Sequence, residues 1–424
     1  MALDSFVVQG ESPLKGTVEV SGSKNAALPI MAACILVDGE VTLRNVPQLD
    51  DVKNMAGILK ELGLEVKWED PHVLRVWPGN GRKITAPYER VRKMRASFCV
   101  LGPLLAKRHR ARVSLPGGCN IGTRPVDLHL KGLKALGAEV DIRRGYVEAR
   151  ARELHGEEMF LGGPFGSTVL GTANVMMAAS MAKGITVIEG AACEPETGDL
   201  ARFLNACGAR IEGAGSPRLK IEGVKALGGC EFEIIHDRIE AGTFLVATAI
   251  AGGKVTVKNA CAGHLHAVIE KLSEVGVHIE KAGGALIVSA SNRRVRATDV
   301  TTYAYPGFPT DLQGQMMALL AIGDGISVIT EKIFPDRFMH VAELNRMGAD
   351  IRKEGPSAIV VGVDSLSGAP VMASDLRASA ALLLAALVAK GKTEINRVYH
   401  IDRGYERIDK KLARLGARIK RIEK

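Results

Sequence analysis

Aromatic residues are scarce in this sequence. Phe, Trp and Tyr make up only 4% of its 424 residues, although the formal net charge is +9. Proteins that bind nucleic acid usually interleave aromatic side chains with a stripe of basic residues, whereas the basic residues here are dispersed. We therefore expect the positive charge to serve small anionic substrates. A basic nucleic-acid-binding repeat protein is the weakest alternative.

Long hydrophobic runs are also missing. The Ala- and Leu-rich stretches extend over about ten to fifteen residues, whereas a helix that spans a membrane needs ~20. No positively charged and then apolar leader opens the chain, so we expect no signal peptide. The sequence thus predicts a cytoplasmic protein with no membrane partner.

Cysteine motifs are absent as well. The seven cysteines are an odd number with no CxxC spacing, which indicates reduced thiols in the cytoplasm rather than disulfides or zinc. Cys34 and Cys207 fall at apolar helical positions and are predicted to be small core residues. No phosphate-binding GxxxxGK[ST] loop occurs either, and we predict no metal and no cofactor.

The sequence does contain one short phrase six times. An apolar residue precedes an apolar-Gly pair, and a β-branched residue follows three positions after the glycine, as in LKELGLEV ending at Val66. Glycine after an apolar helical residue is typical of a helix C-terminus, and the β-branched residue favours a strand. The six glycines recur every 68 to 74 residues, at Gly63, Gly137, Gly208, Gly276, Gly348 and Gly416. Such a period predicts one supersecondary unit used six times.

A second recurring piece lies upstream of each phrase. It is a stretch that is apolar on nearly every face, as in NAALPIMAACILVDGEVTL, followed by a Gly and a short strand. A helix apolar all round is buried. Each unit therefore reads as buried helix, strand, exposed loop, amphipathic helix, Leu-Gly cap and strand. Six units exceed one core of ~250–300 residues, which predicts two domains of three units, the second opening near DRIEAGTF.

Unusual polar residues stand at the predicted starts of these buried helices. They are Lys24 with Asn25, Arg95, Thr172 with Asn174, Glu240, Asp311 and Arg377. A cation at a helix start opposes the helix dipole, so capping does not explain the three basic cases. Each alone fits a side chain that reaches out to solvent. Three at equivalent repeat positions instead predict a cationic cleft around a polyanion, provided that the buried helices of a domain run parallel.

The most unusual loop is LPGGCNIGTRPVDLH, residues 115–129. Its proline and glycines predict a lid without regular structure. Cys119 stands near the tip, where Arg124 would favour the thiolate. An incidental exposed thiol is the alternative to a reactive one.

Three further loops carry charged candidates. Two prolines precede Asp311 in YPGFPTDLQGQ, which suits a firmly held general base, although an ordinary N-cap is the alternative. Arg337 falls in a turn before a helix. Arg403 lies between Asp402 and Gly404, and a surface ion pair with Asp402 or Glu406 is its alternative.

At these motifs the chain resembles a known family. SGSKNAALP, MRAS, LPGGCNIGTRPVDLH, PGFPTDLQ, RFMH, DLRASA and HIDRGYERI are similar, in order and over essentially the whole chain, to UDP-N-acetylglucosamine 1-carboxyvinyltransferases. The resemblance implies an α/β fold of two inside-out barrel domains, each built from three βαβαββ-like repeats with buried parallel helices. The implied domains are 23–235 and 1–22 plus 236–424, joined by a double crossover.

The resemblance also implies an activity. That family moves the enolpyruvyl group of phosphoenolpyruvate onto the 3-hydroxyl of UDP-N-acetylglucosamine and releases phosphate, which opens peptidoglycan precursor synthesis. Cys119 is then the proton donor and can form a covalent adduct, and Asp311 takes the hydroxyl proton. Lys24 and Arg403 complete the implied catalytic set. Fosfomycin, an epoxide that mimics phosphoenolpyruvate, is expected to alkylate Cys119.

Substrate contacts follow from the same resemblance. For phosphoenolpyruvate it implies Lys24, Asn25, Arg124, Arg337, Arg377 and Arg403. For UDP-N-acetylglucosamine it implies Arg95, Arg124, Pro125, Val126, Asp127, Leu128, Thr168, Val169, Asp311 and Ile333. One departure occurs where the family often has a Ser-Val-Gly-Ala-Thr-like stretch at the diphosphate, because Leu170 stands here in place of its glycine.

Two other functions compete with this one. The sister transferase, 5-enolpyruvylshikimate-3-phosphate synthase, shares the six-unit fold but lacks the cysteine loop. A non-catalytic nucleotide-sugar sensor on this fold should have lost one or more of the implied catalytic residues, all of which are present. The oligomeric state is not predicted.

Overall fold

In the computed structural model, which describes residues 4–116, 126–291 and 294–423, the chain forms two compact units. The N-terminal unit contains the described residues from Gly22 to Ile235. The C-terminal unit contains those up to Ser21 and from His236 onward. Each unit holds three repeats.

The N-terminal unit repeats one order of elements. Its first repeat has α1 (Lys24–Ala33), β3 (Val41–Arg44), α2 (Asp50–Glu61), β4 (Leu64–Asp70) and β5 (Val73–Pro78). The second has β6 (Thr85–Ala86), α3 (Tyr88–Val91), the 3-10 helix η2 (Arg95–Val100), α4 (Leu101–Arg108), β7 (Arg110–Ser114), α5 (Asp127–Ala135), β8 (Glu139–Arg143) and β9 (Tyr146–Arg150). The third has β10 (Glu158–Phe160), the short pair β11 (Gly162–Gly163) and β12 (Gly166–Ser167), α6 (Val169–Ala179), β13 (Ile185–Glu189), α7 (Pro195–Ala206), β14 (Arg210–Glu212) and β15 (Arg218–Glu222), and β16 (Cys230–Glu233) follows.

The C-terminal unit follows the same order. It begins with β1 (Ser5–Gln9) and β2 (Leu14–Glu19), and its first repeat has α8 (Arg238–Ala251), β17 (Gly253–Lys258), α9 (His266–Glu274), β18 (His278–Ala282) and β19 (Ala285–Ala290). The next has β20 (Val300–Thr301), the 3-10 helix η4 (Thr310–Leu312), α10 (Gln313–Leu320), β21 (Ile326–Thr330), α11 (Met339–Arg346), β22 (Asp350–Glu354) and β23 (Ser357–Val361). The last has β24 (Pro370–Met372), α12 (Ala380–Ala386), β25 (Lys392–Asn396), α13 (Tyr399–Asp402), α14 (Ile408–Arg414) and β26 (Arg418–Ile422).

The six repeated glycines confirm the predicted caps. All six adopt positive φ angles between 92° and 103°, a region that glycine reaches without the steric cost of a Cβ atom. Each lies just after a helix and one or two positions before the next strand begins. The phrase recognised in the sequence therefore marks the turn from the amphipathic helix into the next strand of the repeat.

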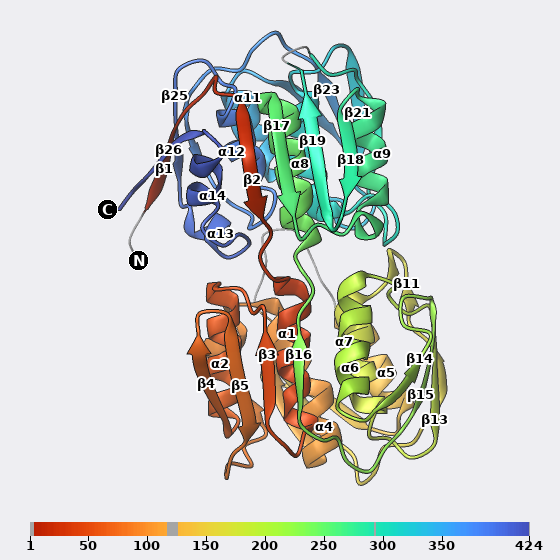
Figure 1. Cartoon of the computed structure of the whole chain (residues 1–424). Helices are drawn as coiled ribbons and strands as arrows, with labels where there is room; N and C mark the ends of the chain where they lie inside the picture. The colour runs from red at the N-terminus through yellow and green to blue at the C-terminus, as the bar shows by residue number, and fades with distance from the viewer. Residues whose placement is uncertain (1–3, 117–125, 292–293, 424) are drawn as a thin grey trace. The chain divides into compact units, whose positions relative to one another are not determined.

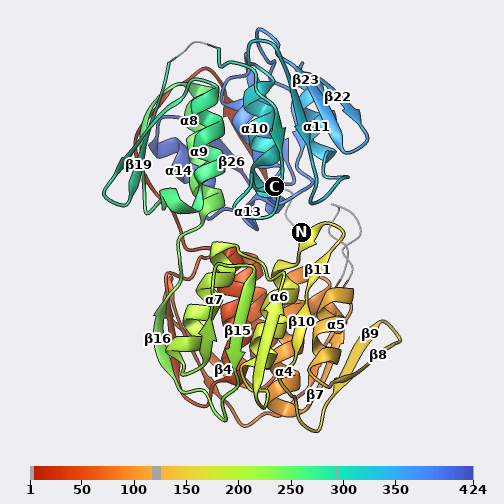
Figure 2. The same cartoon turned by 90° about the vertical axis from the view of Figure 1, so that its right-hand side faces the viewer.

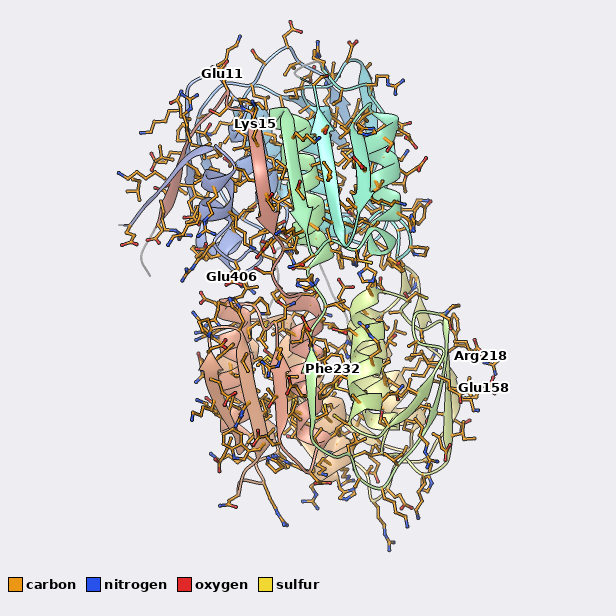
Figure 3. All side chains as sticks on the ribbon, viewed as in Figure 1. Glu11, Lys15, Glu158, Arg218, Phe232 and Glu406 are labelled. Carbon is orange, nitrogen blue, oxygen red and sulfur yellow. The ribbon has the colours of Figure 1, made fainter. Side chains whose placement is uncertain are left out.

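Each repeat contributes a four-stranded sheet with one parallel and two antiparallel pairings. The orders are β16-β3-β5-β4, β6-β7-β9-β8, β10-β13-β15-β14, β2-β17-β19-β18, β20-β21-β23-β22 and β24-β25-β1-β26. In Figure 1, β2, β17, β19 and β18 lie side by side in that order. On the outer side of another of these sheets, Glu158 and Arg218 point away from the helices (Figure 3).

The N-terminal strands complete two sheets of the C-terminal unit. β1 pairs antiparallel with both β25 and β26, so that Phe6 lies opposite Ile395 and Arg421. β2 pairs parallel with β17, where Val18 lies opposite Val257. In this last sheet β1 takes the third position, which the last strand of the repeat takes in each of the other five sheets.

The predicted buried helices form the cores. α4 and α6 pack against each other in the N-terminal unit, and α8, α10 and α12 contact one another in the C-terminal unit. Every residue of α12 is buried, and Figure 2 shows α8 and α10 side by side. Close approach explains the small residues: a Cβ at Gly102 of α4 would lie 2.2 Å from the carbonyl oxygen of Asn174 in α6. Among the described residues, no helix is both long and apolar enough to cross a membrane.

Candidate active site

A buried arginine holds Asp311 in the C-terminal unit. The Arg337 guanidinium donates to Asp311 Oδ1 at 2.7 Å and to Asp375 Oδ1 at 3.1 Å. The Arg337 side chain is 3% exposed, whereas that of Asp311 is 25% exposed. Burial alone would lower the pKa of Arg337, but the charges of Asp375 and Asp311 outweigh it and raise that pKa. Asp311 therefore lies at the start of η4, oriented by a fixed cation and still within reach of a ligand.

Asp375 links this arginine to a second one. Its Oδ1 accepts the backbone N–H groups of Arg377 at 2.8 Å and Ala378 at 2.6 Å. Burial would raise the pKa of Asp375, yet Arg337 and these N–H donors hold it below its ordinary value. One carboxylate thus fixes both the Arg337 side chain and the backbone that carries Arg377. Asp375 was missed in the sequence, although an acid two residues before a predicted helix start is a usable capping signal.

Arg377 is fully buried, and its guanidinium has three kinds of partner. It donates to the Gly404 carbonyl at 2.7 Å, pairs with the Asp237 carboxylate, and lies over the Tyr405 ring at 4.7 Å from the centroid. The negative charge of Asp237 outweighs burial and raises the pKa of Arg377. The sequence singled out Arg377 but missed its counter-ion.

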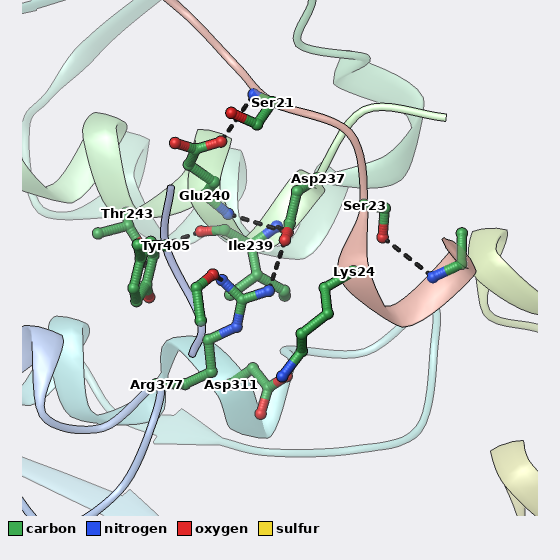
Figure 4. A network of polar contacts seen from close by, with 12 residues as sticks. Ser21, Ser23, Lys24, Asp237, Ile239, Glu240, Thr243, Asp311, Arg377 and Tyr405 are labelled. Carbon is green, nitrogen blue, oxygen red and sulfur yellow. Dashed lines mark hydrogen bonds and ion pairs between the residues drawn. The ribbon is translucent and has the colours of Figure 1, made fainter. Parts of the chain in front are cut away.

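Asp237 and Glu240 organise the start of α8 (Figure 4). Asp237 is the N-cap, because its Oδ1 accepts the N–H groups of Ile239 and Glu240 at 2.9 and 3.1 Å. Glu240 accepts the Ser21 N–H at 2.7 Å and the Lys411 ammonium at 2.6 Å. Burial raises the pKa of Glu240 in spite of Lys411. Glu240, which was expected at a buried helix start, thus forms an internal ion pair with Lys411.

A neutral network lies beneath Arg377. The Tyr405 hydroxyl bonds Thr243 Oγ1 at 3.0 Å and accepts from Gln315 Nε2 at 2.9 Å. Gln315 also donates to the Asp311 carbonyl at 2.9 Å. Burial raises the pKa of Tyr405 to about 12, so the hydroxyl stays protonated. The network connects the ring under Arg377 with the backbone of Asp311.

A buried glutamate that the sequence did not single out, Glu331, binds the backbone at Ile333. Glu331 accepts the N–H groups of Ile333 and Phe334 at 2.8 and 2.9 Å, and its other oxygen accepts the Thr310 hydroxyl at 2.8 Å. It therefore ties the loop of Ile333 to the residue before Asp311. Nothing in its local sequence distinguishes Glu331 from a strand-end surface acid.

Arg403 is half-buried and follows α13. The next residue, Gly404, supplies the carbonyl that Arg377 binds. The backbone beside Arg403 is thus held by the Arg377 guanidinium. Asp402, named above as an alternative partner, binds Arg421 Nη2 at 2.6 Å through Oδ1.

In the N-terminal unit, Lys24 is the buried cation. Its ammonium lies 3.2 Å from Asp51 Oδ2, and both side chains are nearly inaccessible. Ser23 caps α1 by accepting the Ala26 N–H at 3.3 Å, and Asn25 is half-buried in the first turn. Asp51 was missed because an acid in the first turn of α2 resembles ordinary complementation of the helix dipole.

A neutral histidine lies near Arg95 in the same unit. His129 Nδ1 and Asn174 Nδ2 are 2.8 Å apart, and Asn174 also binds the backbone at Phe98 and Gly102. Burial, with a smaller effect of the Arg95 charge, lowers the pKa of His129 to about 3. Asn174, expected at a helix start, instead lies inside α6 and ties together η2, α4 and α5.

The remaining sugar-side candidates lie at helix starts of the N-terminal unit. Val126 precedes α5, Asp127 is exposed in its first turn and Leu128 is half-buried. Thr168 caps α6 by accepting the Gly171 N–H at 3.2 Å, and Val169 begins the helix. Cys119, Arg124 and Pro125 lie outside the described residues. Within the described ranges, no group of three or more His, Cys, Asp or Glu side chains is placed to hold a metal ion.

Asp199 binds the backbone of Ile235, the last residue of the N-terminal unit. Its Oδ2 accepts the Ile235 N–H at 3.1 Å, and its Oδ1 accepts from Arg202 at 2.7 Å. Burial raises the pKa of Asp199 to about 6. The pKa of Asp199 is thus shifted in the opposite direction from that of Asp375 in the C-terminal unit.

Comparison with known proteins decides the family. A model described as EPSP synthase (3-phosphoshikimate 1-carboxyvinyltransferase) matches residues 8–412. The chain belongs to the EPSP synthase family of enolpyruvyl transferases. This transferase is 53% identical over 423 residues to the UDP-N-acetylglucosamine 1-carboxyvinyltransferase of Methylacidiphilum infernorum, with 99% of each chain covered. It is 53% identical over 421 residues, again with 99% of each covered, to the protein of that name from Myxococcus xanthus.

Solved structures agree with this transferase in fold. The enolpyruvyl transferase NikO from Streptomyces tendae matches with a TM-score of 0.89 at 22% identity, covering 100% of both chains. An EPSP synthase from Acinetobacter baumannii matches with a TM-score of 0.74 at 19% identity, also over 100% of both. The predicted α/β fold of repeated βαβαββ units is confirmed.

Proposed function

We propose that the protein transfers the enolpyruvyl group of phosphoenolpyruvate to the 3-hydroxyl of UDP-N-acetylglucosamine, with release of phosphate, as the first committed step of peptidoglycan precursor synthesis. The observation that carries this is the identity above one half, over nearly the whole of both chains, with relatives of that name. From these substrates we also place the enzyme in the cytoplasm, without a membrane or nucleic-acid partner.

Asp311 is the proposed acceptor of the hydroxyl proton. The reaction adds an alcohol to the enol phosphate and then eliminates phosphate, so it needs one group that takes a proton and one that delivers a proton to the methylene carbon. Arg337 and the backbone bond from Gln315 fix the position of Asp311, and its partial exposure leaves the carboxylate accessible. Cys119 is the proposed proton donor and site of the covalent adduct.

Fixed cations are the second requirement. Phosphoenolpyruvate carries a phosphate and a carboxylate, and charge-assisted bonds from preorganised donors stabilise both as charge develops. We assign Lys24, Arg377 and Arg403 to this substrate, together with Asn25, Arg124 and Arg337. The carboxylates of Asp51 and Asp237 keep Lys24 and Arg377 in place before the substrate arrives.

The nucleotide sugar is assigned to the remaining candidates. They are Arg95, Arg124, Pro125, Val126, Asp127, Leu128, Thr168, Val169, Asp311 and Ile333. The N-terminus of α6, beyond the Thr168 cap, suits a diphosphate because helix starts present free N–H groups to anions.

The decisive experiment measures phosphate release from phosphoenolpyruvate by the wild type and by Cys119→Ala. Release that requires UDP-N-acetylglucosamine, and that is lost in the variant and after fosfomycin treatment, is expected. Release with shikimate 3-phosphate instead would identify the sister transferase. No release with either acceptor would favour the nucleotide-sugar sensor, and full turnover after prolonged fosfomycin exposure would remove Cys119 from the mechanism.

A further inference from the structure

Two cysteines far apart in sequence meet in the N-terminal unit. Cys207 Sγ and Cys230 Sγ are 3.3 Å apart, although 23 positions separate them in the chain. Cys207 is the buried C-cap of α7, and Cys230 is the half-buried first residue of β16. Neither belongs to a CxxC motif, so the pair exists only in the fold.

Two contacts hold the segments of this pair together. The Gly228 N–H donates to the Cys207 carbonyl at 2.8 Å. One turn earlier in α7, the ring of Phe203 meets that of Phe232 edge to face, with centroids 5.5 Å apart; Figure 3 labels Phe232 on β16. A disulfide holds its two sulfurs ~2 Å apart, so these sulfurs have to approach each other by only about 1.3 Å to be joined.

The two thiols differ in chemistry. The hydrogen bond from Cys207 lowers the pKa of Cys230, whereas that bond and burial raise the pKa of Cys207. The thiolate is the reactive form of cysteine, and Cys230 is also the more exposed of the two. Burial and, to a smaller extent, the charge of Cys230 raise the pKa of Cys34, whose thiol donates to the Ile30 carbonyl at 3.4 Å within its own buried segment.

We propose that Cys207 and Cys230 form an oxidisable dithiol, which a peroxide converts into an intrachain disulfide between α7 and β16. The Cys230 thiolate attacks one oxygen of hydrogen peroxide, forming an S–O bond and releasing hydroxide as the O–O bond breaks. The Cys207 sulfur then attacks the Cys230 sulfenic acid, so that the S–S bond forms and the S–O bond breaks. The Cys207 proton leaves with the departing oxygen as water. This site is independent of the proposed transfer reaction.

The disulfide would strengthen the N-terminal unit. Closing a loop of this length restricts the unfolded chain, so the oxidised protein should melt about 3–10 °C higher than the reduced one. A resolving thiol next to a sulfenic acid also prevents further oxidation to sulfinic acid. In reducing conditions both cysteines remain thiols, as the cysteine pattern of the sequence predicted.

The experiment is peptide mapping of the full-length protein after treatment with hydrogen peroxide near stoichiometric amounts. Free thiols are then alkylated and the chain is cut with trypsin, which separates the two cysteines into peptides 203–210 (FLNACGAR) and 226–238 (ALGGCEFEIIHDR). The expected product is these two peptides joined, two hydrogens lighter than their sum, and separated again by a reductant. It should be absent from Cys230→Ser and from protein oxidised in denaturant.

Cys193→Ser is the matched control, because Cys193 is a half-buried cysteine of the same unit whose sulfur has a backbone partner instead, the Ala191 carbonyl. This variant should form the joined peptides at the wild-type rate. Recovery of both peptides as separate alkylated species would overturn the proposal. So would a disulfide that joins Cys207 or Cys230 to any other cysteine, or accumulation of Cys230 sulfinic acid at the same rate with and without Cys207→Ser.

Discussion

The two units stabilise their buried polar groups in different ways. In the C-terminal unit, Arg337 and Arg377 are each matched by buried carboxylates that also bind backbone N–H groups. In the N-terminal unit, the Lys24 ammonium lies 3.2 Å from the Asp51 carboxylate, and His129 and Asn174 form a neutral buried pair.

The difference follows from the cost of burying charge. An ion removed from water is stable only when its partners replace most of the lost solvation. A repeat that places a fixed guanidinium at its centre must therefore supply an acid for it, whereas a neutral imidazole needs only hydrogen bonds. The same repeat can thus hold buried guanidinium groups with several acids in one unit and a buried neutral pair in the other.

The largest expected effect concerns the carboxylate at the centre of the C-terminal network. Asp311→Asn should lower kcat by about 10²–10⁴-fold, the usual contribution of a general base, while Asp375 keeps Arg337 paired and the fold intact. The check is phosphate release at saturating substrates. Asp364→Asn, at an exposed ion pair with Arg294, should retain normal turnover; an unaffected kcat in Asp311→Asn would exclude the proposed role.

Removal of a buried cation should cost more in the C-terminal unit. Arg377→Met leaves the buried Asp237 without its counter-ion, and we expect a loss of about 3–5 kcal/mol in the free energy of unfolding. Lys24→Met leaves Asp51 in the first turn of α2, where the helix dipole favours an anion, and should cost less. Urea denaturation of both variants measures the difference. Equal losses would contradict the contrast between the two units.

The capping glycines provide a similar comparison. A Cβ at Gly63 would lie 2.5 Å from the backbone of Gly81, whereas nothing lies within 4 Å of one at Gly276. Gly276→Ala should cost about 1–2 kcal/mol for its positive φ alone, and Gly63→Ala about 2–4 kcal/mol because the neighbouring backbone must also move. Thermal denaturation of the two variants tests this order. A greater loss at Gly276 would show that the contact with Gly81 is relieved at no cost.

The last comparison is a pH dependence with opposite signs at two buried acids, Asp199 of the N-terminal unit and Asp375 of the C-terminal unit. The pKa of Asp199 is about 6 in the folded chain and ~3.9 unfolded, so the folded state binds this proton more tightly. Its carboxylate therefore destabilises the fold above pH ~6, and lowering the pH from 6 to 4 removes about 1–3 kcal/mol of that cost.

Two asparagine variants measure this effect. The unfolding free energy of Asp199→Asn relative to wild type should be highest at neutral pH and fall toward pH 4. Asp375 has a lowered pKa, so its contribution is present above the unfolded pKa and is lost as the pH falls through the folded value. Asp375→Asn should accordingly be most destabilised at neutral pH. Parallel pH profiles for the two variants would rule out the difference in sign.

Local sequence was enough to predict the repeat. Gly63 and its five counterparts follow apolar helical residues, and each has the positive φ that a helix C-terminus requires. The stretch that became α12 is apolar on every face and is buried on every face. These features depend on neighbours in the chain, so a pattern of about ten residues contains them.

The cations of the candidate site were also visible in sequence, because Lys24 and Arg377 stand at the starts of apolar runs and Arg337 falls in a turn before a helix. Their partners were not. Asp51, Asp237, Asp375 and Glu331 look locally like ordinary helix-start or strand-end acids, and only long-range packing gives them buried cations and backbone donors.

The sequence by itself determined the six-fold repeat, the buried helices and the unusual charges at their starts, since these follow from apolar periodicity and the conformational preferences of glycine. The tertiary structure alone decided which acid pairs with which cation, that β1 lies between β25 and β26, and that Cys207 meets Cys230. The physical reason is range: local propensity acts over a few residues, whereas ion pairs, strand partners and thiol pairs join positions that only the packed core brings together.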